Sequence, residues 1–212
     1  MRLLYLLIMV AIGCGAASAQ TEDFYKPKMT KAEAVAYLED AGVDLLPDNL
    51  PGRILSGDAD GVEAMIVAGI DLKAKGSLPQ SPLQLAAQSC TRGAHVKPAD
   101  TLRMIDLLLG GGVDPNHDGM AGLTALILAA QQQCPPIVIK HLLAGGAKLE
   151  QRTPQGFTAL SMALIVANFD AAETLIEAGA RLSPEAGRKF LTGTKDDNPR
   201  LVELIGRATA GK

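Results

Sequence analysis

The chain has 212 residues, about the length of one domain, and a formal net charge of −3 with no block of basic residues. This charge argues against nucleic acid as a partner. Hydrophobic residues make up 48% of the sequence, but aromatic residues make up only 3% and tryptophan is absent, a composition that fits small aliphatic helices stacked closely on one another.

The first 19 residues have the pattern of a secretory signal peptide. Arg2 precedes the apolar run 3–12, and the small residues 17–19 form a cleavage site directly before Gln20. The apolar run is shorter than the roughly 20 residues that cross a bilayer. We therefore expect cleavage between Ala19 and Gln20, export to a bacterial-type periplasm, and no membrane span.

The segment that follows predicts a helical cap at the N-terminal end. Residues 20–30 are polar and predict an extended segment. Thr30 and Glu33 have the spacing of a capping box, which predicts a helix from residue 31 that is closed by Gly42. No first helix of a pair precedes this one. A short helix near residues 50–55 and a second over 60–68 come next.

A helix-turn-helix unit then recurs, and recurrence at a period near 33 residues is typical of stacked repeats. Each second helix ends in a glycine, and 12 residues later a serine or threonine begins the next first helix. The pairs are Gly69 and Ser81, Gly112 and Thr124, and Gly146 and Thr158. The hydroxyl side chains suit helix N-caps. The segments between, 70–80, 113–123 and 147–157, are rich in turn-forming residues and predict hairpins, which we call fingers.

This unit resembles the ankyrin repeat. The helix starts SPLQLAA (81–87), TALILAA (124–130) and TALSMAL (158–164) are similar to the T-P-L-H-x-A pattern of that family, although the histidine is replaced by Gln84, Ile127 and Ser161. The resemblance covers about residues 31–205.

The resemblance implies an all-α ankyrin-repeat solenoid of about five repeats including caps. The domain organisation that we expect is a signal peptide over 1–19, an extension over 20–30 and a repeat domain over 31–212. Residues 184–191 and 199–208 predict a final, more polar helix pair that caps the open end of the stack.

Two cysteines lie beyond the expected cleavage site, Cys90 and Cys134, each at the end of a first helix in consecutive repeats. Because adjacent repeats touch and exported proteins meet an oxidising compartment, we predict a disulfide between them. The alternative is two buried free thiols. About ten extra residues, 90–99, form either a second contact surface or a tolerated loop pinned by the disulfide. If Cys14 were lipidated, the protein would be anchored to a membrane; this is the alternative to a free periplasmic protein.

Motifs of catalysis and metal binding are weak or missing in the sequence. Residues 114–119 match the start of a calcium loop, but Ala125 stands where that loop requires a bidentate glutamate, so we interpret the segment as a hairpin turn. His95, His117 and His141 lack the spacing of zinc ligands. We expect no metal, no cofactor and no enzyme activity.

The remaining candidate is a binding site for a partner protein on the surface of the repeats. In ankyrin-like proteins, partners usually dock on the fingertips and on the exposed side of the first helices, so the resemblance places partner binding there. The fingertip candidates are Lys75, Ser77, Leu78, His117, Asp118, Met120, Arg152, Thr153 and Gln155. Leu123 and Phe157 precede first helices, and Leu85, Leu128 and Met162 lie within them. If exposed, these apolar residues form a binding patch; the alternative is that they stack repeat on repeat.

The family and the expected compartment together imply a monomeric periplasmic module that binds a protein partner. The leading expectation is an inhibitor or immunity protein, for self-protection, that blocks a toxic effector or a cell-wall hydrolase. The alternatives are an accessory factor in periplasmic oxidative-stress defence that supports catalase, and a scaffold for envelope complexes.

Overall fold

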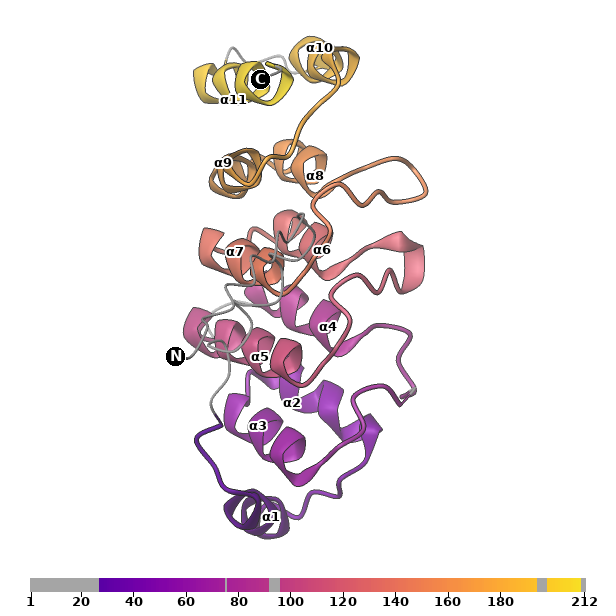
Figure 1. Cartoon of the computed structure of the whole chain (residues 1–212), viewed down its shortest axis with the longest axis vertical. Coiled ribbons are helices and arrows are strands. Elements are labelled where there is room, and N and C mark those ends of the chain that lie inside the picture. Colours follow the sequence, from indigo (N-terminus) through magenta and orange to yellow (C-terminus); the bar gives the residue numbers. More distant parts are fainter. Residues whose placement is uncertain (1–26, 75, 92–95, 194–197, 211–212) are drawn as a thin grey trace, which may run out of the picture.

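The computed structural model describes residues 27–74, 76–91, 96–193 and 198–210. In these residues the regular structure is helical, and the helices stack in pairs along one long axis (Figure 1). The predicted all-α solenoid is therefore confirmed. The expected signal peptide and its cleavage site between Ala19 and Gln20 lie outside the described residues, as does the fingertip candidate Lys75.

The helices form two layers. The first helices of the pairs are α2 (Leu50–Ser56), α4 (Pro82–Gln88), α6 (Ala125–Gln131), α8 (Ala159–Ile165) and α10 (Pro184–Gly193). The second helices are α3 (Ala59–Ala68), α5 (Pro98–Gly110), α7 (Pro136–Ala144), α9 (Phe169–Glu177) and α11 (Pro199–Thr209). A single helix, α1 (Lys31–Asp40), covers the N-terminal end by packing on α3. Short 3-10 turns lie at η2 (Pro47–Asn49), η3 (Ser89–Thr91) and η5 (Met120–Gly122).

Local hydrogen bonds begin and end these helices as the spacing predicts. The side chains of Ser81, Thr124 and Thr158 each accept a hydrogen bond from the backbone N–H three residues later. Thr30 and Glu33 form the predicted capping box at the start of α1. The glycine that closes α9, Gly179, has φ of 105°, a conformation that a side chain would disfavour.

The core runs the length of the stack between the two layers. Ala86, Ala129 and Ala163 on consecutive first helices have no exposed surface. Their small size lets the helices approach closely, and α4, α6 and α8 pack one on the next. Leucine, isoleucine and methionine side chains from the second helices complete the core, including Met104, which is fully buried. Each repeat thus contacts mainly its neighbours, as in other solenoids.

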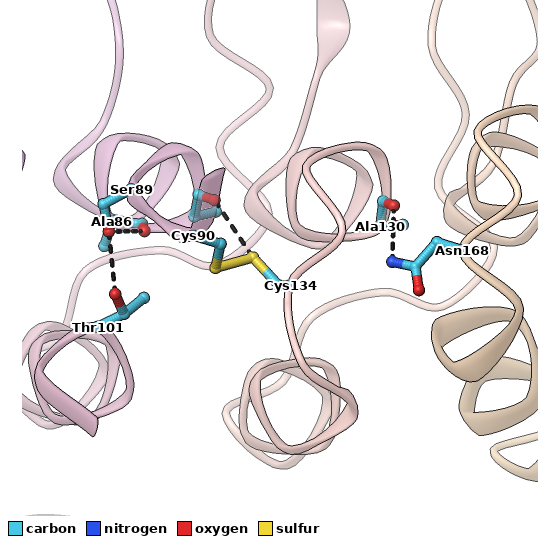
Figure 2. Close-up of a disulfide and its surroundings, with 8 residues drawn as sticks. Ala86, Ser89, Cys90, Thr101, Ala130, Cys134 and Asn168 are labelled. Atoms are coloured by element: carbon cyan, nitrogen blue, oxygen red, sulfur yellow. Dashed lines mark hydrogen bonds between the residues drawn. A yellow bond between two sulfur atoms is a disulfide. The ribbon is translucent and has the colours of Figure 1, made fainter. Parts of the chain in front are cut away.

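A disulfide joins two consecutive repeats (Figure 2). It links Cys90, just after α4, to Cys134, in the turn between α6 and α7, with Cα atoms 5.2 Å apart. The predicted bridge is therefore confirmed. Sγ of Cys134 lies 3.3 Å from the Ala87 carbonyl oxygen, and because a bridged sulfur carries no proton this approach is a contact only. In the chain-entropy model, closing a loop of this length stabilises the fold by about 4 kcal/mol.

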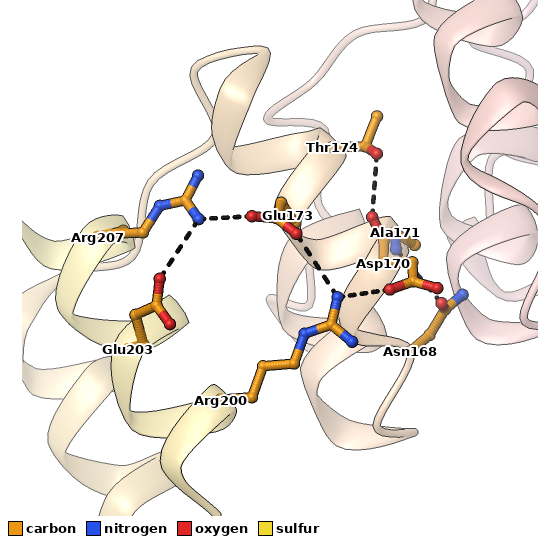
Figure 3. Close-up of polar contacts among 8 residues, drawn as sticks. All are labelled: Asn168, Asp170, Ala171, Glu173, Thr174, Arg200, Glu203 and Arg207. Atoms are coloured by element: carbon orange, nitrogen blue, oxygen red, sulfur yellow. Dashed lines mark hydrogen bonds and ion pairs between the residues drawn. The ribbon is translucent and has the colours of Figure 1, made fainter.

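Ion pairs connect successive second helices on the opposite layer. Arg103 on α5 pairs with Asp60 and Glu63 on α3. At the C-terminal end, Arg200 and Arg207 on α11 reach the carboxylates of α9, as Figure 3 shows. Each cation belongs to the later repeat and each acid to the earlier one. These pairs therefore link repeats across their interfaces, and Arg207 also pairs with Glu203 within α11.

A buried carboxylate holds the first described residues against the stack. Glu63 is 1% exposed, and its side chain accepts hydrogen bonds from the backbone N–H groups of Lys28 and Met29 while it pairs with Arg103. These partners compensate the cost of burying the charge. The chain preceding α1 is thereby tied to α3, and through Arg103 to α5.

Candidate protein interaction site

The fingers project from one edge of the stack, beside the first helices (Figure 1). Their fold is set by backbone turns and short side-chain bonds. In the third finger the Thr153 N–H donates to the Phe157 carbonyl over 2.9 Å, and the Thr153 hydroxyl accepts from the Phe157 N–H over 3.2 Å. Gly156 closes the turn with φ of 86°. The hairpin is thus held rigid before any partner arrives.

Hydrogen bonds also join one finger to its neighbours. The Asn116 amide donates to the Gly146 carbonyl over 3.0 Å, and its oxygen accepts from the Lys148 N–H over 2.7 Å. Asp114 accepts from the Asn116 N–H, a local Asx-type turn. In the first finger, the Ser77 N–H donates to Asp48 over 2.6 Å. The segment that matches the start of a calcium loop therefore uses Asn116 to connect the second and third fingers.

Several candidates from the sequence lie on the accessible finger surface. Leu78 is 42% exposed and Phe157 is 39% exposed. The side chains of Ser77, His117, Asp118, Arg152 and Gln155 are also exposed. For Met120 the structure places the backbone in η5, and its side chain is not among those described. Whether these residues touch a partner remains a prediction.

At three positions on the first helices the side chains stack repeat on repeat and are not exposed. Leu85, Leu128 and Met162 are buried, because the close stacking of α4, α6 and α8 covers that side of each helix. Thr153 is also buried, where its hydroxyl supports the finger turn. Leu123 is half-buried against the core. These residues therefore pack in the stack or support the fingers.

Gln84 stands where the family pattern has a histidine, and it forms hydrogen bonds within its own repeat and to the next one. Its side chain is 1% exposed, and both the oxygen and the nitrogen of its amide form hydrogen bonds. The amide oxygen accepts from the Ser81 N–H over 2.6 Å, which completes the capping box of α4. The amide nitrogen donates to the Leu123 carbonyl of the next finger. One side chain thus fixes both the start of its own helix and the base of the neighbouring finger.

The three histidines take different places. His117 is exposed on the second finger, and His95 lies outside the described residues. Nδ1 of His141 on α7 lies 2.6 Å from a carboxylate oxygen of Asp106 on α5. Burial raises the pKa of Asp106, and the hydrogen bond from His141 opposes that rise. His141 therefore belongs to the connections between second helices, as expected for a helix-packing residue.

Neither metal binding nor membrane crossing is indicated by the residues that the structure covers. Nowhere among them do three or more His, Cys, Asp or Glu side chains gather into a potential metal site. None of their helices has the length and apolar character that spanning a bilayer requires. On the finger edge, the accessible features include the fingers and the grooves beside them.

Two grooves open on this edge. The larger, of about 780 Å³, lies between the first two fingers, and its titratable lining residues are Lys73, Asp114, His117 and Asp118. The other, of about 430 Å³, lies between the third finger and α10. Its lining includes Ile165, Arg181, Lys189 and Phe190, which the sequence alone did not single out. Both volumes lie in the range of ligand sites in proteins.

Residues 93–186 match the family model for ankyrin repeats, in three copies. The chain contains ankyrin repeats. It is 47% identical over 77 residues to human SH3 and multiple ankyrin repeat domains protein 2, which is 36% of this chain and 4% of that protein. It is 36% identical over 103 residues to SH3 and multiple ankyrin repeat domains protein 1 of human and of mouse, 46% of this chain and 5% of each of those proteins. The chain thus matches only a small fraction of the length of these curated relatives.

The ankyrin repeats, together with the open finger edge, make this chain a protein-binding module. Ankyrin-repeat proteins are generally interaction scaffolds rather than enzymes, and nothing in the described residues indicates catalysis.

Proposed function

We propose that this protein is an exported, periplasmic inhibitor or immunity protein that covers the active site of a toxic effector or a cell-wall hydrolase. The observation that supports binding most directly is the row of fingers with Leu78 and Phe157 exposed on it. Large apolar side chains held on a rigid projecting edge are typical of surfaces that meet another protein.

Export is proposed from two features of different kinds. Residues 1–19 have the pattern of a signal peptide. The disulfide between Cys90 and Cys134 suits a compartment in which disulfides persist. A cytosolic protein would hold the same two cysteines as thiols. Oxidation of this pair in protein isolated from cells, measured by thiol labelling, is the direct check on the compartment.

An inhibitory role is supported by the rigidity of the fingers. The hydrogen bonds within the third finger and from Asn116 to Gly146 and Lys148 hold neighbouring hairpins in one arrangement. A preorganised surface loses little conformational entropy on association, which favours tight binding. A protein that must keep an enzyme blocked benefits from such a surface.

A crosslinked pull-down of the protein from its own cell envelope tests the proposal. We expect a wall hydrolase or toxin to be recovered in stoichiometric amount and to lose activity in the complex. Phe157→Glu and Leu78→Glu should each weaken capture, because a charge would be buried in the interface. Ile137→Glu is the matched control, since Ile137 is 45% exposed on α7, away from the fingers.

Two outcomes contradict the proposal. One is recovery of housekeeping proteins alone. The other is a deletion strain that becomes sensitive to peroxide while it stays resistant to the toxin, which would favour the role in oxidative-stress defence. Leu128→Glu is unsuitable as a test, because Leu128 is 4% exposed and a charge there would destabilise the stack itself.

A further inference from the structure

The groove between the third finger and α10, here called the terminal groove, differs from the rest of the finger edge. Its charged and large apolar lining residues include Arg152, Phe157, Ile165, Arg181, Lys189 and Phe190. They come from the third finger, the end of α8, the linker after α9, and α10. The groove therefore forms only when the last ankyrin-like repeat and the C-terminal helix pair are both in place.

The terminal groove exists because one finger is missing. Twelve residues separate Gly146 from Thr158, whereas only four separate Gly179 from Ser183, the residue whose hydroxyl accepts from the Ala186 N–H at the start of α10. The linker in Figure 1 accordingly runs from α9 to α10 without a projecting hairpin. The first helices α2 to α8 pack one on the next, but α8 and α10 do not pack closely in this way. The outer side of the third finger is thus left uncovered.

Apolar residues line this opening where other repeats carry polar ones. Seven residues after the N-cap, the first helices have Gln88 on α4, Gln131 on α6, Ile165 on α8 and Phe190 on α10. Ile165 is 51% exposed, and Phe157 beside it is 39% exposed. Leaving such side chains in water forgoes the favourable free energy that their burial against a partner would supply. The change from glutamine to apolar residues coincides with the groove.

The charged residues that line the terminal groove have one sign. Its titratable lining residues are Arg152, Arg181 and Lys189, although the whole chain carries a net charge of −3. Two acids contact these residues from outside the lining: Glu150 accepts from the Arg181 backbone N–H, and Glu185 forms an exposed pair with Lys189. The groove between the first two fingers has lining residues of both signs. A basic groove on an acidic protein favours an acidic ligand.

The arginines are oriented by the protein itself. The Arg152 guanidinium donates to the Gly156 carbonyl over 3.1 Å, and that of Arg181 donates to the Ile176 and Ala180 carbonyls. A guanidinium has five N–H donors, so each group retains donors for a carboxylate. The side chains are thus held near the groove with hydrogen-bonding capacity to spare.

We infer that the terminal groove binds an extended acidic segment of the partner protein, in which carboxylates flank a large apolar side chain. The apolar side chain lies over Phe157 and Ile165, and the carboxylates meet Arg152, Arg181 and Lys189. This inference rests on the proposed function and names the chemistry of the part of the partner that enters this site.

Selection from a displayed library of random twelve-residue peptides tests the inference. We expect enrichment of sequences in which Asp or Glu flank Leu, Ile, Phe, Tyr or Trp. A selected peptide, labelled and measured by fluorescence anisotropy, should bind at least tenfold more weakly to the double variant Arg152→Glu/Lys189→Glu and to Ile165→Gln. Ile165→Gln installs the residue that two other repeats carry at this position, so the fold is expected to tolerate it.

The controls separate the groove from general electrostatics. Lys73→Glu changes an exposed cation in the other groove and should leave binding unchanged. A peptide with Asn and Gln in place of its acids should bind at least tenfold more weakly, and added salt should weaken the acidic peptide. Selected peptides without acidic residues, or an equal loss with Lys73→Glu, would overturn the inference. So would dimerisation of the protein, seen by sedimentation, that Ile165→Gln abolishes, because a second copy would then occupy the groove.

The same variants keep this inference separate from the proposed function. If the envelope partner is captured equally by wild type and Arg152→Glu/Lys189→Glu, but not by Leu78→Glu, the groove inference fails and the binding function stands. If acidic peptides bind the groove but no envelope partner is captured, the proposed function fails.

Discussion

Side-chain amides connect one repeat to the next. Gln84 bonds to the Ser81 N–H of its own helix and to the Leu123 carbonyl of the next finger, and Asn168 donates to the Ala130 carbonyl of the preceding repeat over 3.1 Å. At the position of Gln84 the later repeats have Ile127 and Ser161. The Ser161 hydroxyl can only satisfy its own cap at Thr158. The side-chain connection from helix to neighbouring finger is therefore stronger in the first full repeat.

The two hydrogen bonds of Gln84 should therefore contribute to stability. Gln84→Met keeps the size of the side chain but leaves the Leu123 carbonyl and the Ser81 N–H without their partner. We expect the free energy of unfolding to fall by about 1–3 kcal/mol, the usual cost of an unpaired buried polar group. Urea unfolding measures it. Gln155→Met, on an exposed fingertip, is the matched control and should change stability by less than about 0.5 kcal/mol. Equal stability of both variants would show that the amide bonds add nothing.

At the scale of elements, the C-terminal helix pair is attached by both packing and charge. Leu201, Leu204 and Ile205 on α11 are buried. Beside them Arg207 lies 2.7 Å from Glu173 on α9, and Arg200 pairs with Asp170 (Figure 3). Exposed pairs of this kind contribute little at neutral pH and in salt. Their effect is more visible as a dependence on pH.

The pH dependence follows from Glu173. The hydrogen bond from Arg207 holds the pKa of the Glu173 carboxyl below its usual range. A lowered pKa stabilises the folded state above the unfolded pKa of about 4.3, and that contribution disappears as pH falls through the lower folded pKa. Glu173→Gln should therefore be less stable than wild type at pH 7, and the difference should shrink as the pH falls below about 4.3, the unfolded pKa of a glutamate. Urea midpoints across this range measure it.

The matched control is Glu185→Gln, which removes an exposed partner of Lys189 within α10 alone. Its effect should be smaller, because the pair joins no two helices. A Glu173→Gln deficit that is the same at every pH would mean that packing, and not ionisation, accounts for the loss.

Most helix starts could be predicted from the sequence, because they depend on nearby residues. The exposure of side chains was harder to predict, because it depends on which helices pack against them. The 12-residue spacing and the hydroxyl caps predict where α4, α6 and α8 begin, because a cap acts within one turn of its helix. The exposure of Leu128 depends on which helices flank it, and periodicity alone does not reveal that both sides are covered. The terminal groove depends on a missing finger. The short interval from Gly179 to Ser183 is visible in the sequence. That it leaves a groove becomes clear only from the structure, in which α8 and α10 do not pack closely.

The whole molecule is a one-dimensional stack, and its stability should vary along the axis. Each repeat contacts mainly its neighbours, so local opening is expected to start at the ends. The disulfide joins the α4/α5 and α6/α7 repeats and restrains the middle. The C-terminal pair has no such bond in the described residues. Opening there would separate Phe190 from Ile165 and Phe157 and would dismantle the terminal groove.

This gradient can be measured by hydrogen exchange. Leu204→Ala removes a side chain that is 1% exposed and should cost about 2–5 kcal/mol locally. We expect faster exchange in α10 and α11, little change in α3, and weaker binding at the terminal groove. Leu108→Ala on α5, where the leucine is fully buried, should instead accelerate exchange in the repeats on both sides. If Leu204→Ala accelerates exchange equally from α3 to α11, the stack opens as a single unit. The groove would then share the stability of the whole molecule, and binding there would not be lost ahead of global unfolding.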